Sequence, residues 1–115
     1  MEPKVDPNTA LLDAAQAFAA LGSEQRLCVI RTLVRAGPEG LSIGELADRT
    51  GINGANLTHH LRFLTHAGLV SRTRKGRSII CAAVAYERVQ ALADYLLSEC
   101  CADTSSSIHE HGNPR

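Results

Sequence analysis

GINGANLTHHLRFLTHAG, residues 51–68, is the most informative stretch of this 115-residue chain. Within it, Leu57, Leu61 and Leu64 recur at the spacing of one helical face. The remaining positions carry short amides, hydroxyls and an arginine, where an ordinary solvated helix would carry Glu and Lys. Such side chains can reach base edges and phosphates in the major groove of DNA. The stretch therefore predicts a recognition helix; the alternative is a solvated helix face that happens to lack acids.

Positive charge is concentrated around this stretch. No Asp or Glu occurs between Arg49 and Tyr86. Before Arg49 there are four basic and seven acidic residues, and after Tyr86 there are two and five, so the net charge is zero. This asymmetry is expected of a polyanion-binding element on an otherwise acidic body. The basic residues of the acid-free region are Arg49, Arg62, Arg72, Arg74, Lys75 and Arg77.

The segments on either side of residues 51–68 predict a winged helix-turn-helix. Ser42 caps a short helix, with Glu45 three residues later as in a capping box, and residues 50–53 form the turn into the recognition helix. Residues 69–74 and 78–82 flank Lys75-Gly76-Arg77 and predict a short hairpin with a basic tip. A hairpin in that position is a wing.

Three further helices are expected. Thr9 is the predicted N-cap of a first helix that ends at Gly22, and Ser23 opens a second that stops within residues 36–40. A last helix runs from Ala85 to Cys100-Cys101. In the second helix, the residues expected to face inward are Leu27, Ile30, Leu33 and Val34. The first and last helices carry apolar stripes that are too wide to be covered by so small a core. These stripes comprise Leu11, Leu12, Ala15, Phe18 and Ala19 in the first helix and Val89, Leu92, Ala93 and Leu96 in the last.

The length and composition indicate one small domain. Residues 9–101 carry all the periodic segments, residues 1–8 read as a flexible arm, and residues 102–115 read as a disordered, Ser-rich tail. Ala and Leu dominate and aromatic residues are few, so the expected class is mainly α with a small β-hairpin. No segment reads as a membrane span or a secretion signal, so the chain is expected in the cytoplasm, with its cysteines reduced.

This order of elements resembles the arsenical-resistance repressors, the ArsR/SmtB family of winged-helix transcriptional regulators. The resemblance covers about residues 9–101. The family implies a homodimer whose first and last helices form the interface, and which releases a near-palindromic operator when an inducer binds. Two copies on one face of the duplex would double the phosphate contacts and match the operator's symmetry. The motifs that carry the resemblance are ALGSEQRL (20–27), GELA (44–47), LTHHLRFL (57–64), AGLV (67–70) and RKGR (74–77).

The residues expected to contact DNA fall into two groups. Those on the recognition helix should choose the sequence, and those in or near the wing should hold phosphate or the minor groove. His60 is interpreted as a packing residue, because its position in the family faces less directly outward. The expected DNA-binding residues are Asn56, Thr58, His59 and Arg62 on the helix, and Arg72, Arg74, Lys75 and Arg77 in the wing region.

The adjacent cysteines Cys100 and Cys101 are the predicted sensor. Neighbouring side chains on a helix point about 100° apart, so such a pair fills a core poorly, whereas two close thiolates suit a thiophilic ion. One arsenite-sensing branch of the resembled family ends its last helix in a similar run, here SECC at 98–101. The resemblance thus implies As(III) or Sb(III) as inducer, with no constitutive cofactor.

The third ligand that this branch supplies a few residues later is missing, because no cysteine follows Cys101. The alternatives for this third ligand are Cys28 or Cys81 of either subunit, His109, His111 or solvent. If they are not ligands, Cys81 is expected to be a small strand residue and Cys28 a core residue. The tail histidines are then expected to be solvated.

Other functions remain as alternatives. Cys28 with Cys100 or Cys101 would suit a thiol-redox or persulfide-responsive repressor, although the second-helix position of that branch matches Arg31 here. Another thiophilic metal ion is a further alternative inducer, and a winged helix that binds only a protein partner is another reading. An enzyme is not expected, because there is no Cys-x-x-Cys, no Gly-rich phosphate loop and no Ser-His-Asp arrangement that fits one cleft.

Overall fold

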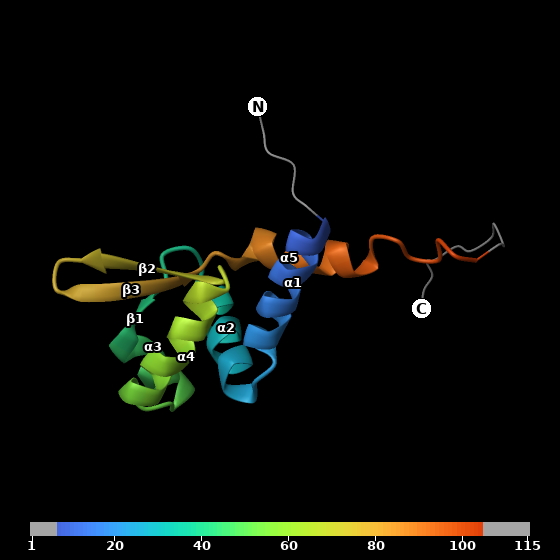
Figure 1. Ribbon diagram of the computed structural model, residues 1–115. Coiled ribbons are helices and arrows are strands. Elements are labelled where there is room, and N and C mark those ends of the chain that lie inside the picture. Colours follow the sequence, from blue (N-terminus) through green and yellow to red (C-terminus); the bar gives the residue numbers. More distant parts are fainter. Residues whose placement is uncertain (1–6, 105–115) are drawn as a thin grey trace.

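The computed structural model describes residues 7–104 and contains five helices and one three-stranded antiparallel sheet (Figure 1). This arrangement confirms the predicted winged helix-turn-helix. The sheet order is β1-β3-β2. The helices are α1 (Pro7–Leu21), α2 (Glu24–Ala36), α3 (Ile43–Thr50), α4 (Gly54–His66) and α5 (Ala85–Leu97), and the strands are β1 (Leu41–Ser42), β2 (Val70–Lys75) and β3 (Ser78–Ala83).

Local hydrogen bonds fix the boundaries of the helix-turn-helix. The predicted capping box is present at the start of α3, where Ser42 Oγ accepts from the Glu45 N–H and the Glu45 carboxylate accepts from the Ser42 N–H. Gly51 ends α3 in the left-handed conformation, with φ of 74°, which glycine adopts without strain. Asn53 then caps α4 by accepting a hydrogen bond from the Asn56 N–H at 2.9 Å. The sequence between residues 42 and 56 therefore dictates the turn.

Two predicted helix boundaries were wrong. Helix α1 begins at Pro7 rather than at Thr9, because proline suits the first position of a helix, where its missing N–H is not needed. Helix α5 ends at Leu97, so Cys100 and Cys101 lie in turns beyond it. Residues 1–6 of the predicted arm and residues 105–115 of the predicted tail lie outside the described residues.

The wing is the predicted hairpin with an additional strand. Strands β2 and β3 pair from Val70↔Ala83 to Lys75↔Ser78, and Gly76, with φ of 62°, begins the two-residue turn. The third strand, β1, pairs with β3 through Leu41↔Cys81. It was not predicted, because two residues cannot show the alternation by which a strand is recognised in sequence.

The core lies between α1–α4 and one face of the sheet. The apolar stripe of α4 is completely buried, as predicted, and so are Leu33 of α2 and Leu46 of α3. Burying such side chains contributes about 2 kcal/mol each, which anchors α4 firmly in the domain. The largest fully buried side chains are Leu33, Leu46, Leu57, Leu61, Leu64, Leu69, Val29 and Cys81.

The predicted inward face of α2 was wrong in part, and the apolar stripe of α1 lies mostly outside the core. Ala14, Ala17 and Ala20 form the buried side of α1, while Leu11, Leu12 and Phe18 are exposed. In α2, Val29 is buried and Leu27 and Val34 are exposed. The small alanines allow α1 to approach its neighbours closely. The large side chains of the predicted α1 stripe therefore remain on the surface.

Helix α5 also exposes most of its apolar stripe. Leu92 is buried, but Val89 and Leu96 of the predicted stripe are exposed, and so are Tyr95 and Leu97. Figure 1 shows α5 crossing α1, on the side of the molecule away from the wing tip, and the two helices are in contact. Within residues 7–104, no helix is long and apolar enough to cross a bilayer. We call the exposed apolar surface of these two helices the α1–α5 face; it comprises Leu11, Leu12 and Phe18 of α1 with Val89, Tyr95, Leu96 and Leu97 of α5.

Candidate nucleic-acid interface

Helix α4 presents its polar side chains to solvent because its leucines are locked in the core. Asn56, His59 and Arg62 are exposed, and Thr58 is half-buried. Thr58 Oγ1 donates a hydrogen bond to the Gly54 carbonyl at 2.9 Å. Its proton is therefore already used, and the hydroxyl is left to accept, which suits an amino group on a base edge.

His59 is held in place by an aromatic contact that the sequence did not reveal. Its ring packs edge-on against Phe63, one helical turn later, with ring centroids 5.1 Å apart. The Arg26 guanidinium lies 4.7 Å from the Phe63 ring centroid, and its Nε donates to the Ala20 carbonyl at 2.7 Å. Arg26 thus ties the start of α2 to the outer side of α4. The i, i+4 spacing of His59 and Phe63 was the available signal.

His60 packs inward, as its interpretation as a packing residue requires. Its Nε2 lies 3.0 Å from Gln25 Oε1, and because that amide oxygen can only accept, Nε2 carries the proton. The other ring nitrogen, Nδ1, is buried with no hydrogen-bond partner within the described residues. Burial, and then the positive charge of Arg26 and the proximity of His59, lower the pKa of His60 below its usual 6.5.

Acidification should therefore destabilise the fold through His60. A histidine whose folded pKa is lowered contributes stability that is fully present above about pH 6.5 and is lost as the pH falls towards the folded value. We expect the free energy of unfolding, measured by urea titration, to fall more steeply between pH 7.5 and 5 in the wild type than in His60→Gln. The glutamine amide can still donate to Gln25 but does not titrate. Equal pH slopes for the two proteins would contradict this role.

The wing residues divide between the two faces of the hairpin. Arg72 and Arg74 lie opposite Cys81 and Ile79, on the face of β2 and β3 that meets the helices, whereas Lys75 lies on the other face. Arg77 is in the turn, and all four basic side chains are exposed. Figure 1 shows the hairpin projecting beyond α3 and α4.

Within residues 7–104, the basic side chains of α4 and the wing form no ion pairs. The one ion pair in residues 7–104 joins Arg88 to Asp13, away from this surface. The residues predicted to meet DNA therefore lie on two consecutive elements that contain no Asp or Glu, joined by the short turn after His66, although Glu39 lines a hollow beside Lys75. Such a surface can bind a polyanion without first breaking internal ion pairs.

The predicted sensor cysteines lie together beyond α5. Their sulfur atoms are 3.5 Å apart, and both residues are exposed. The Cys100 N–H donates to the Leu97 carbonyl at 3.0 Å, and Cys101 adopts a left-handed conformation with φ of 64°. With bonds of about 2.3 Å, as thiolates form to zinc, two sulfurs at this separation can bind one ion at an angle of roughly 100°.

The chemistry of the pair favours binding of an electrophilic centre by both sulfurs together. The hydrogen bond with Cys100, then loss of hydration and the charge on Cys100, raise the pKa of the Cys101 thiol. A second thiolate beside the first is disfavoured until a positive centre binds both. The pair is therefore expected to lose its protons on binding rather than before it.

A complete three-ligand site is not formed by the described residues. Within residues 7–104, no three His, Cys, Asp or Glu side chains gather closely enough to hold one metal ion. Cys81 is buried on β3, as a strand residue should be, and burial raises the pKa of its thiol. The candidate ligands His109 and His111 lie outside the described residues.

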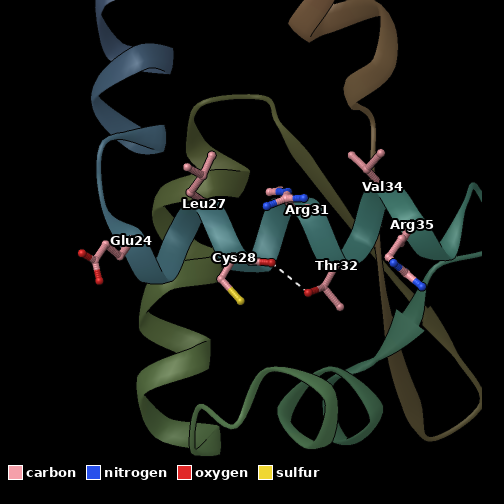
Figure 2. A pocket seen from close by; sticks show the side chains of 7 residues that line it. All are labelled: Glu24, Leu27, Cys28, Arg31, Thr32, Val34 and Arg35. Atoms are coloured by element: carbon pink, nitrogen blue, oxygen red, sulfur yellow. Dashed lines mark hydrogen bonds between the residues drawn. The ribbon is translucent and has the colours of Figure 1, made fainter.

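Cys28 was predicted to be a core residue, and that prediction was wrong. It is exposed on α2, in a shallow hollow that Leu27 and Arg31 also line (Figure 2). The Thr32 hydroxyl donates to the Cys28 carbonyl at 2.8 Å, so only the backbone of Cys28 is engaged. Figure 1 shows the segment after α5, which carries Cys100 and Cys101, projecting away from the helical body. Cys28, on α2, therefore lies in a different part of the molecule from that pair.

Part of the chain is similar to known helix-turn-helix proteins. Residues 21–73 match the family described as a helix-turn-helix domain. The chain is 39% identical over 64 residues to the HTH-type transcriptional regulator YceK of Bacillus subtilis, a match that covers 56% of this chain and 63% of YceK. It is 37% identical over 71 residues to the HTH-type transcriptional regulator NmtR of Mycobacterium tuberculosis, covering 62% of this chain and 57% of NmtR. Each match spans less than two thirds of the relative's length.

Solved structures give the same fold. The crystal structure of an ArsR family transcriptional regulator is similar with a TM-score of 0.65 and 26% identity, over 76% of this chain and 91% of that one. The homodimeric winged helix-turn-helix DNA-binding domain of Mb0332 from Mycobacterium bovis has a TM-score of 0.64 and 23% identity, over 96% of this chain and all of that one. These relatives and structural neighbours are regulators or DNA-binding domains, not enzymes.

Proposed function

We propose that this chain, which has a helix-turn-helix domain and the winged-helix fold of ArsR-family regulators, is a dimeric transcriptional repressor. It binds operator DNA through α4 and the wing and leaves it when As(III) or Sb(III) binds Cys100 and Cys101. The observation that carries the DNA-binding part is the exposed polar and basic side chains of α4 and the wing, two elements that contain no Asp or Glu. The polar side chains of α4 are exposed because Leu57, Leu61 and Leu64 are fully buried on the opposite side.

The α1–α5 face supports a homodimer. It gathers large apolar side chains on two adjacent helices, with Leu12 and Leu96 each about two-thirds exposed in the single chain. Contiguous exposed apolar surface of this kind usually marks an interface, because leaving it in water costs free energy. A second copy would cover it by a two-fold axis and place two α4 helices towards one duplex.

The exposed thiol pair supports an inducer that is thiophilic. Two thiols can replace two hydroxyl groups of arsenous acid and release two water molecules, and the 3.5 Å separation of the sulfurs fits one central atom. Because the pair directly follows α5, binding restrains the end of a helix that also forms the α1–α5 face. A shift of that interface changes the spacing of the two recognition helices, which releases the operator.

Arginine substitutions test the DNA-binding surface. Arg62→Ala should weaken operator binding by about tenfold or more, as expected for a side chain that reads a base. Arg77→Ala should weaken binding to all duplexes and reduce the slope of log affinity against log salt by about one. Fluorescence anisotropy with a duplex selected from a random pool by the wild type measures both.

Arg35→Ala is the matched control. It removes the same charge from an exposed position on α2 and should leave the operator affinity within about twofold. Unchanged binding by both Arg62→Ala and Arg77→Ala would remove the assignment of α4 and the wing as the DNA-binding surface.

The exposure of Cys28 favours one second candidate, a repressor that responds to thiol oxidation or persulfides. An exposed thiol on α2 is open to reaction, which a core cysteine is not. Mass spectrometry after polysulfide treatment separates the two candidates: a crosslink between the Cys28 peptide and the Cys100-Cys101 peptide supports the redox function, and its absence together with an intact arsenite response supports metalloid sensing.

A further inference from the structure

Arg88, in the first turn of α5, connects three helices. Its Nη1 donates to Asp13 Oδ2 of α1 at 2.9 Å, and its Nη2 donates to the Ala67 carbonyl at 3.2 Å. Ala67 is the residue that closes the C-terminal end of α4. The Arg88 side chain is 23% exposed, so the guanidinium is largely enclosed by these partners. One side chain therefore contacts both helices of the α1–α5 face and the end of the recognition helix.

The contact with Ala67 has a clear physical basis. The last carbonyls of a helix lack intrahelical donors and carry the negative end of the helix dipole, so a guanidinium there is favourable. Gly68, with φ of 77°, turns the chain immediately after Ala67. A Cβ at position 68 would lie 3.8 Å from Arg88 Nε, which shows how closely the arginine passes the turn.

The contact with Asp13 holds the Arg88 guanidinium against α1. It is the one ion pair in residues 7–104, and it joins α1 to α5 across the sequence. A guanidinium is planar and holds two partners in a fixed relative geometry, which an ammonium group cannot do. Asp13 of α1 therefore sets the orientation of the Arg88 side chain. Through that side chain, α1 also constrains the position of the end of α4.

We infer that Arg88 is a positioning residue that sets the orientation of the recognition helix relative to the dimer interface. This inference rests on the proposed function, because it assigns α4 to DNA and the α1–α5 face to the second copy. A change in α5 that follows inducer binding reaches α4 through this guanidinium. The backbone bond from the Val84 N–H to the Leu69 carbonyl, at 3.1 Å, links the same regions on the strand side.

The test compares two duplexes, one with both half-sites of the selected operator and one with a single half-site. Arg88→Met keeps the apolar stem but removes both hydrogen bonds. It should lower affinity for the complete operator by about tenfold and for the single half-site by less than about twofold. A residue that merely stabilises the fold would affect both duplexes equally. A residue that contacts phosphate once per half-site would also weaken binding to the single half-site, by about the square root of its effect on the complete operator. Sedimentation velocity should show that the variant still forms a dimer.

Asp13→Asn is the second variant, and it keeps the bond from Arg88 to Ala67. Asp13 is 57% exposed, so this change should leave the fold intact even if Arg88→Met does not. It should lower affinity for the complete operator by about threefold and leave half-site binding unchanged. A loss of affinity for the single half-site, or no loss of affinity for the complete operator, would overturn the role of Arg88 alone. A wild type that binds neither duplex would overturn the proposed function together with it.

Discussion

Leu12→Glu should convert the protein into a monomer and lower its operator affinity by at least about a hundredfold. Leu12 is 65% exposed on α1, so a glutamate there is well solvated in the single chain. In the dimer, the same carboxylate would be buried in an apolar interface without a partner, which costs several kcal/mol. A monomer keeps only half of the phosphate contacts, so both its affinity and its salt dependence fall.

Leu12→Met is the matched control at the same position. It keeps an apolar side chain of similar volume and should remain dimeric, with operator affinity within a few fold of the wild type. Sedimentation velocity gives the oligomeric state and fluorescence anisotropy gives the affinity. A Leu12→Glu protein that stays dimeric and binds normally would place the interface elsewhere than the α1–α5 face.

Cys100→Ser/Cys101→Ser should abolish the response to arsenite while leaving operator binding in its absence unchanged. Both side chains are exposed and lie beyond the end of α5, so serine at these positions should not disturb the fold. Serine hydroxyls are hard, weakly acidic ligands that do not replace thiolates for a soft centre. The operator complex of the wild type, titrated with arsenite, should dissociate at concentrations that leave the double variant bound.

Cys28→Ser is the control for the sensor prediction. It removes an exposed thiol of the same chain from α2 and should retain the full arsenite response if the pair is sufficient. Loss of the response in Cys28→Ser would make Cys28 a third ligand or a redox partner. An equal arsenite response in the wild type and in the double serine variant would rule out the pair as the sensor.

The recognition helix could be predicted from sequence because its signals are local and unambiguous. Leu57, Leu61 and Leu64 mark one narrow face. The other positions of that helix are polar or small, except for the aromatic Phe63. The caps at Ser42 and Asn53 and the turn at Gly51 depend only on residues a few positions away. Elements of this kind are specified by their own segment, so the sequence pattern and the structure agree.

Which sides of α1 and α2 are covered by the core could not be predicted with the same success. Alanine and leucine occur on nearly every side of α1, so periodicity could not show that Ala14 and Ala17 are buried while Leu11 and Leu12 are exposed. The choice depends on how closely neighbouring helices approach, which is a tertiary property. The large side chains left outside are the ones that the proposed dimer needs.

In the candidate site, the exposure of a single side chain could be predicted from sequence, but its contacts with residues of other elements could not. The exposed position of His59 followed from the helix pattern, but its packing against Phe63 beneath Arg26 did not, because Arg26 comes from α2. The contacts of Arg88 span 21 and 75 residues of sequence, so no local pattern could indicate them. The exposure of Cys28 was missed for the same reason, since only the packed fold shows which side of α2 is covered.

In the proposed function, two copies of this chain bind one duplex through α4 and the wing. Sedimentation velocity of a labelled operator duplex, titrated with the wild-type protein, tests it most directly. We expect a complex with the mass of one duplex and two chains, which dissociates as the salt concentration is raised. A protein that sediments as a monomer and leaves the duplex unshifted even in dilute buffer would contradict it.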